Sequence, residues 1–231
     1  MFQTNPFLLI ALFIGLSLLP FVAMIATSYL KIVVVMSLIR NALGIQSIPP
    51  NMVINALAMI LTFYIMAPTM SESWQIAKRE LGGDSSVVSQ VSEPAQPQPG
   101  MQLETEAVAK AAEPFREFLS RHTSDRERAF FVHTAETLWG KDGELASVDP
   151  ESFYILLPAF CVSELTKSFQ IGFLVYLPFI AIDIIISNIL LAMGMMMVSP
   201  VTISLPFKLL LFVMVNGWTL LIQGLVRGYI L

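Results

Sequence analysis

The sequence predicts an all-α protein of a membrane complex, with four long hydrophobic helices that form two hairpins and a polar helical insert between them. Three observations lead to this fold class. Hydrophobic residues make up 55% of the 231 residues, and only 13% are charged, against about 25% in a typical soluble domain. Twenty-three of the 30 charged residues lie within residues 72–151. This distribution excludes an ordinary soluble enzyme domain, a disordered regulator and a disulfide scaffold.

The first apolar block, residues 1–71, contains two candidate membrane spans. Residues 6–30 carry no charge, and about 20 apolar residues are enough to cross the hydrocarbon core of a bilayer. Pro49 and Pro50 indicate a break between helices. Residues 52–70 then form the second span.

The middle block, residues 72–152, is a polar insert. Residues 72–151 hold 15 acidic and 8 basic residues. Residues 85–100 are rich in Ser, Gln and Pro, which is typical of a flexible linker. Residues 104–139 show helical periodicity. Because the insert has few large apolar side chains to bury, we expect it to be only weakly stable alone.

The second apolar block, residues 153–231, contains the other two spans. Residues 153–162 are apolar and lead into a short polar patch at residues 163–168. Residues 169–192 form the third span, and residues 205–226 form the fourth.

The few charges near the first two spans predict an orientation in the membrane. Lys31 and Arg40 lie in the first short connection without an acidic neighbour, so the positive-inside rule places this connection in the cytoplasm. The insert is then expected on the periplasmic side. The first five residues contain no Lys or Arg, so we interpret residues 6–30 as a retained helix rather than a cleaved leader.

Asp183 is the strongest chemical anomaly, because it lies near the middle of the third span. A carboxylate there costs about 2.5–3.5 kcal/mol on insertion scales, so it should face a partner or water. Lys208, near the start of the fourth span, is the candidate partner, within one chain or between subunits. Two interpretations remain open: an ion or proton site, and a buried pair that fixes packing or assembly.

Two further features stand out in the second apolar block. Glu164 and Lys167 are three residues apart on an expected helix, so they form a second pair or bind a neighbour. The connection between the third and fourth spans contains three consecutive methionines. Methionine is flexible and polarisable, so such a loop could seal a channel around a passing chain or simply pack between helices. These three residues are Met195, Met196 and Met197.

Motifs for catalysis or cofactor binding are lacking. His122 and His133 are too far apart for a zinc motif, and the single cysteine, Cys161, is expected to be a buried apolar residue. No phosphate-binding or nucleophile motif and no basic run is found. The sequence predicts a protein that is not an enzyme and that needs no cofactor, metal or nucleic acid.

Several long segments resemble signatures of the FliP/SctR family. The first apolar block contains TSYLKIVVVMSLIRNALG at residues 27–44 and IPPN at residues 48–51. The insert contains EPFREFL at residues 113–119. The second apolar block contains YLPFIAID at residues 176–183, MGMMM at residues 193–197, PVTISLPFK at residues 200–208 and Gly217 with Trp218. One departure is Asn216, where the family commonly has Asp.

The resemblance implies a core pore-forming subunit of the type III secretion export gate in the bacterial inner membrane. The implied assembly has about five copies of the chain, with FliQ/SctS-like, FliR/SctT-like and FlhB/SctU-like subunits and membrane lipid. It would conduct unfolded secretion substrates, with residues 195–197 as a gasket. The resemblance also suggests inter-subunit pairing of Asp183 and Lys208, and helices that lie partly above the bilayer. The absent leader favours the injectisome branch over the flagellar one.

Two other classes of function stay open. Asp183 would suit a transporter or channel for small solutes or ions, although no inverted repeat relates the two apolar blocks. The chain could also be a purely structural scaffold.

Overall fold

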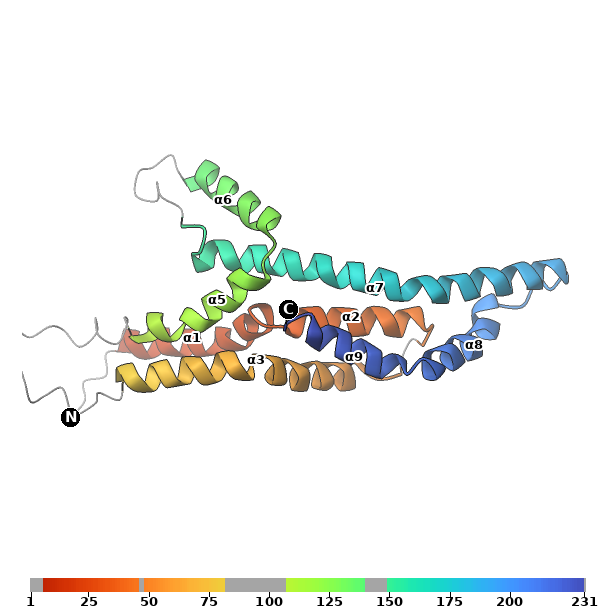
Figure 1. Ribbon diagram of the computed structural model, residues 1–231, viewed down its shortest axis with the longest axis horizontal. Coiled ribbons are helices and arrows are strands. Elements are labelled where there is room, and N and C mark those ends of the chain that lie inside the picture. The colour runs from red at the N-terminus through yellow and green to blue at the C-terminus, as the bar shows by residue number, and fades with distance from the viewer. Residues whose placement is uncertain (1–5, 46–47, 82–106, 140–148, 231) are drawn as a thin grey trace, which may run out of the picture. The chain divides into compact units, whose positions relative to one another are not determined.

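The computed structural model describes residues 6–45, 48–81, 107–139 and 149–230. Within these ranges the chain is helical and contains no strand, so the all-α prediction is confirmed (Figure 1). The predicted linker at residues 85–100 lies outside them. The helices are α1 (Pro6–Ile25), α2 (Tyr29–Ala42), α3 (Asn51–Leu81), α5 (Glu113–His122), α6 (Asp125–Trp139), α7 (Phe153–Ala192), α8 (Pro200–Met214) and α9 (Gly217–Arg227).

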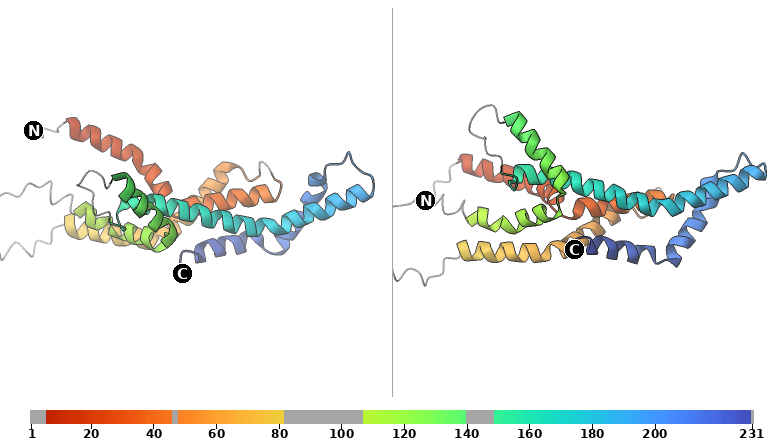
Figure 2. Two further views of the ribbon diagram at one scale, coloured as in Figure 1. Left: turned by 90° about the horizontal axis from the view of Figure 1, so that it is seen from above. Right: turned by 45° about the horizontal axis from the view of Figure 1, so that its top comes forward.

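Among the residues that the structure describes, two helices are each long and apolar enough to cross a bilayer, at Asn51–Glu80 and Phe153–Ala192. The other two apolar segments are broken. Residues Phe13–Ile25 of α1 are bent by 57° relative to α2, and α8 is bent by 59° relative to α9. Figure 2 shows the second bend from two directions. Four spans therefore result only if each bent pair counts as one.

The predicted first span was wrong in its boundary, because α1 ends at Ile25. The hydroxyl of Thr27 donates a hydrogen bond to the Ala23 carbonyl at 2.6 Å. The same oxygen accepts a bond from the Tyr29 amide at 3.4 Å. A threonine that bonds to nearby backbone offers the chain an alternative to the helix, which hydropathy does not detect.

The fourth apolar segment breaks at Asn216, which has a left-handed backbone with φ of 51°. Asparagine tolerates this conformation better than most residues. The next residue, Gly217, lies against the Phe212 ring, and a Cβ atom there would overlap it. The break thus depends on both Asn216 and Gly217. The predicted single helix over residues 205–226 was wrong.

The long helix α7 runs through the polar patch that was expected to precede the third span. It has 40 residues and so extends for about 60 Å, roughly twice the hydrocarbon thickness of a bilayer. The patch does not interrupt the helix because its members Ser163, Glu164 and Ser168 are buried in the fold.

The chain divides into two compact units, one formed by Met1–Ile65 with Cys161–Leu231 and the other by Met66–Phe160. Their borders fall inside α3 and α7. The three-part division at residues 71 and 152 stays a prediction.

The core of the first unit is built around α2. One face of this helix is buried, at Lys31, Ile32, Val35, Met36, Ile39 and Ala42. These positions recur at helical spacing and pack against apolar side chains of α3, α7, α8 and α9. Figure 1 shows α2 beside α7 and α9. Gly172 of α7 permits a close approach, since a Cβ atom there would overlap Leu38 of α2.

The second unit has a smaller core. Phe118 of α5 lies 5.8 Å from Phe160 at the start of α7, measured between ring centroids. Leu119 and Leu156 are fully buried beside them. The helical periodicity predicted for residues 104–139 corresponds, in the described part, to more than one helix, because α5 ends at His122 and α6 begins at Asp125.

Candidate functional site

The structure joins Asp183 and Lys208 within one chain. The Lys208 ammonium nitrogen lies 2.6 Å from Oδ2 of Asp183. The two side chains come from α7 and α8, which are connected by a short turn. The lysine side chain is 4% exposed and the aspartate 31%. The aspartate charge therefore has both a direct counter-charge and partial access to its surroundings.

Two further groups complete this site. The hydroxyl of Ser204, one turn before Lys208 on α8, donates to Oδ1 of Asp183 at 2.6 Å. The Lys208 ammonium also donates to the Ala42 carbonyl at 3.4 Å. Ala42 is the last residue of α2, where backbone carbonyls lack partners within the helix and attract cations. This Asp183 pair thus connects the end of α2 with α7 and α8.

Glu164 forms the centre of a second cluster and is completely buried. Its Oε2 lies 2.8 Å from the Lys31 ammonium nitrogen of α2. Its Oε1 accepts a hydrogen bond from Lys167, one helical turn later, at 3.3 Å. The Tyr229 hydroxyl also donates to Glu164. A single buried carboxylate therefore binds two lysines and Tyr229.

Tyr229 contributes to this Glu164 cluster in two ways. The Lys31 ammonium lies 3.9 Å from the centroid of its ring, which is cation–π geometry. Burial, followed by the nearby Glu164 carboxylate, raises the pKa of the Tyr229 phenol far above its usual value. The hydroxyl therefore remains protonated at physiological pH and can donate to the carboxylate.

Lys31 and Arg40 do not lie in a loop, which corrects the basis of the predicted orientation. Both belong to α2, and Lys31 is buried against Glu164. The Arg40 guanidinium donates to the Asn51 side chain and, at 3.4 Å, to the Pro49 carbonyl. Arg40 thus bridges the end of α2 and the start of α3. Hydropathy assigned both residues to a loop because it detects neither the buried carboxylate beside Lys31 nor the uncharged acceptors of Arg40.

The three methionines lie in the turn between α7 and α8. The turn begins at Gly194, whose φ is +73°. The Met195 amide donates to the Leu190 carbonyl, and the Gly194 amide donates to the Leu191 carbonyl, both at 3.0 Å. This pair of bonds with a left-handed glycine is the Schellman helix end. It turns the chain away from α7 and projects the following side chains.

The exposure of these side chains rises along the turn. Met195 is 43% exposed, Met196 82% and Met197 fully exposed. Packing between α7 and α8, one of the two expectations for this segment, is therefore absent for Met196 and Met197.

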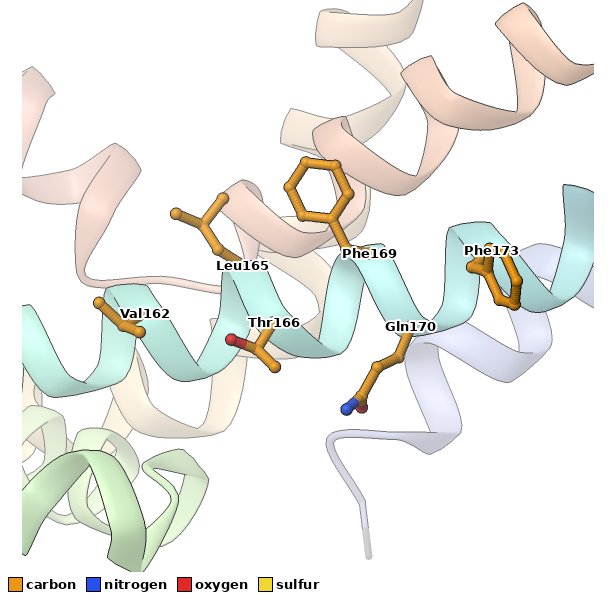
Figure 3. Close-up of a pocket in the computed structure, with 6 residues that line it drawn as sticks. All are labelled: Val162, Leu165, Thr166, Phe169, Gln170 and Phe173. Atoms are coloured by element: carbon orange, nitrogen blue, oxygen red, sulfur yellow. The ribbon is translucent and has the colours of Figure 1, made fainter.

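A second exposed apolar surface lies along α7. Figure 3 shows six side chains of this helix that line a shallow hollow, and all of them come from α7 alone. Phe169 and Phe173 belong to this set and are 58% and 61% exposed. Aromatic side chains exposed at helical spacing on a helix are typical of a surface that meets lipid or another protein.

Ser204 and Tyr229 are site residues that sequence reasoning missed. Ser204 lies four residues before Lys208, so helical spacing could have placed it on the same face. Tyr229 had no such signal, because it is 65 residues from Glu164 along the chain. Among the described residues, no group of three or more His, Cys, Asp or Glu side chains could hold a metal ion.

Comparison with known proteins gives matches over nearly the whole chain. Residues 12–225 match the FliP family. The chain is 49% identical over 217 residues to Yop proteins translocation protein R of Yersinia pestis, covering 93% of this chain and 92% of that protein. It is 46% identical over 222 residues to hypersensitivity response secretion protein HrcR of Ralstonia nicotianae, covering 96% of each.

A flagellar relative is also similar but longer. The flagellar biosynthetic protein FliP of Pectobacterium carotovorum is 40% identical over 220 residues, which cover 95% of this chain and 77% of that protein. Identity is thus higher to the two relatives named for secretion and translocation. The resemblance stated from the sequence motifs is confirmed: the chain belongs to the FliP family, the export-apparatus proteins of type III secretion.

Proposed function

We propose that the chain is a pore-forming subunit of the type III secretion export gate and conducts unfolded secretion substrates across the bacterial inner membrane. The observation that carries this proposal is the exposed methionine turn on a protein of the FliP family. The injectisome type of apparatus is favoured by the higher identity to HrcR and to the translocation protein R. The chain has a mechanical role and performs no catalysis.

The subunit works in an assembly. Only 11% of an apolar 18-residue stretch of α7 is buried within the chain. Such a large apolar surface is covered by lipid or by other subunits. We infer about five copies of this chain, joined by FliQ/SctS-like, FliR/SctT-like and FlhB/SctU-like subunits. We also propose that the insert lies on the periplasmic side.

The methionine turn is the gasket of this pore. Several copies of Met196 and Met197, brought together by assembly, would form a deformable apolar constriction. Methionine side chains have several rotatable bonds and re-pack around partners of different shape. A closed constriction of this kind excludes ions because an apolar lining dewets.

The test replaces Met195, Met196 and Met197 by Ala in the complete export complex. We expect increased uptake of a small dye or of ions by cells, while the size of the complex on native gels stays unchanged. The matched control replaces three exposed methionines of α3, Met52, Met59 and Met70, by Ala and should not leak. A tight triple mutant would count against the gasket.

Substrate conduction has a separate test. A cysteine in place of Met196 should cross-link to a secretion substrate that is trapped in the channel by a folded fusion. A purely structural scaffold predicts no such cross-link. Transport of a small ion through Asp183 is disfavoured, because each of its two carboxylate oxygens has a hydrogen-bond donor within the chain.

A further inference from the structure

An apolar cavity of about 490 Å³ lies in the first unit, among α2, α7, α8 and α9. Its walls are formed only by apolar side chains and glycines of these four helices and of Val215 between α8 and α9. They include Ile39, Phe179, Phe212, Leu221, Gly224 and Leu225. The volume lies within the usual range for ligand pockets, about 300–1,000 Å³.

Water is a poor occupant of this cavity. An ordered water needs two to four polar partners, whereas no polar side chain lines these walls among the described residues. The helices around the cavity belong to apolar segments that suit a bilayer. A hydrocarbon chain suits such walls, because it needs no hydrogen-bond partner.

Two glycines of α9 border the cavity differently. A Cβ atom at Gly217 would overlap the Phe212 ring, so this glycine is needed for packing. A Cβ atom at Gly224 would meet nothing within 4 Å. Gly224 and Gly228 have the GxxxG spacing that is typical of closely packed membrane helices. In this chain, however, Gly224 faces open space. The missing side chain keeps the cavity accessible from α9.

A cationic group lies at the end of the same helix. Arg227 is exposed and follows the lining residues Leu220 and Gly224 by seven and three positions, so helical spacing places it on their side of α9, one turn beyond Gly224. Within the described part of the chain, its guanidinium has no hydrogen bond or ion pair. The cavity thus combines an apolar interior with a free guanidinium at one end, which is complementary to an anionic headgroup attached to a hydrocarbon chain.

We propose that this cavity binds one acyl chain of an anionic phospholipid, whose phosphate contacts Arg227. The lipid fills the space between α2 and α9 and holds the bent α8–α9 pair against the rest of the unit. This assignment is independent of the proposed secretion function and can fail or succeed without it.

The test is lipid binding to the purified full chain in mild detergent, measured by native mass spectrometry. The probes are palmitoyl-oleoyl phosphatidylglycerol, the matching phosphatidylcholine and inorganic phosphate. We expect one tightly bound phosphatidylglycerol per chain, with about fivefold preference over phosphatidylcholine, as expected for one basic side chain near an anionic headgroup. Inorganic phosphate alone should not bind.

Two variants separate the cavity from the headgroup contact. Gly224→Leu places a branched side chain where the acyl chain would lie, and should weaken the binding of both lipids by about tenfold or more. Arg227→Gln should remove only the preference for phosphatidylglycerol. The matched controls are Gly15→Leu, at another helix glycine with open space, and Arg126→Gln, at an exposed arginine of α6. Both should bind lipid like the unmodified chain.

Several results would overturn the assignment. Equal lipid binding by Gly224→Leu and Gly15→Leu would place the lipid elsewhere. If phosphatidylglycerol is not preferred, or if Arg227→Gln retains that preference, the proposed contact between Arg227 and the phosphate is wrong. Binding of inorganic phosphate with the affinity of the phospholipid would exclude a role for the acyl chain. If the chain forms dimers without lipid and Gly224→Leu abolishes these dimers, a second copy of the chain fills the cavity instead.

Discussion

The two charge clusters of the first unit use similar groups in different surroundings. The Glu164 side chain is 0% exposed and accepts from Lys31, Lys167 and Tyr229. The Asp183 side chain is 31% exposed and accepts from Lys208 and Ser204. Both clusters tie α7 to other helices, one through α2 and the C-terminal end, the other through α8 and the last carbonyl of α2.

The difference shows how burial sets the cost of losing one partner. Removing one member of a fully buried ion pair leaves the other charge without solvent or counter-charge, which costs several kcal/mol. In the Asp183 pair one member is partly exposed, and the buried Lys208 keeps a second acceptor in the Ala42 carbonyl, so losing the pair should cost less. We therefore expect the Glu164 cluster to stabilise the fold and the Asp183 pair to be more tolerant.

The largest effect is expected for Glu164→Gln. The neutral amide leaves the Lys31 ammonium buried without its carboxylate, so the free energy of unfolding should fall by about 3–5 kcal/mol. A denaturant titration in detergent measures this loss in the free energy of unfolding. Glu136→Gln, at a side chain that is 59% exposed, is the control and should change little.

A double variant sharpens this prediction. Lys31→Met combined with Glu164→Leu removes both charges and should recover much of the loss, since an apolar pair needs no counter-charge. A loss of less than about 1 kcal/mol in the single variant would mean that burial does not dominate the energy of this cluster.

Asp183→Asn is expected to have an intermediate effect, about 2 kcal/mol on the same titration. Lys208 keeps its bond to the Ala42 carbonyl, but loses its carboxylate. The exchange of Asp183→Lys with Lys208→Asp should restore part of the loss. If the isolated chain is unaffected while assembly into the complex fails, the pair acts between subunits rather than within one chain.

The smallest effects are expected from deleting one hydroxyl in each cluster. Tyr229→Phe removes a donor to a buried carboxylate and should cost about 1–1.5 kcal/mol. Ser204→Ala removes a donor to the partly exposed Asp183 and should cost about 0.5 kcal/mol, because the carboxylate retains access to its surroundings. Melting temperatures measured side by side test the order, and the reverse order would contradict the burial argument.

The apolar segments could be predicted from the sequence because hydropathy depends only on composition over about 20 residues. The helical insert could be predicted in part, but its break after His122 could not. Neither could the break at Thr27, which results from one side chain bonding to the backbone. A window average does not contain such single-residue effects.

The candidate site divides in the same way. Asp183 and Lys208 could be paired from the sequence, because each is an isolated charge in an apolar segment. Lys31 was misplaced in a loop, since its partner Glu164 is 133 residues away in the chain. Tyr229 carried no charge and lay beyond the last span, so no pattern indicated its role.

The sequence alone determined that this protein is helical, apolar in two blocks and a member of a secretion-apparatus family, because composition and ordered motifs are local properties. The tertiary structure decided which charges meet, where the apolar segments bend and that the methionine turn is exposed. It also created the cavity beside Gly224. These features depend on contacts between residues distant in the chain, whose energies arise only when α2, α7, α8 and α9 pack together.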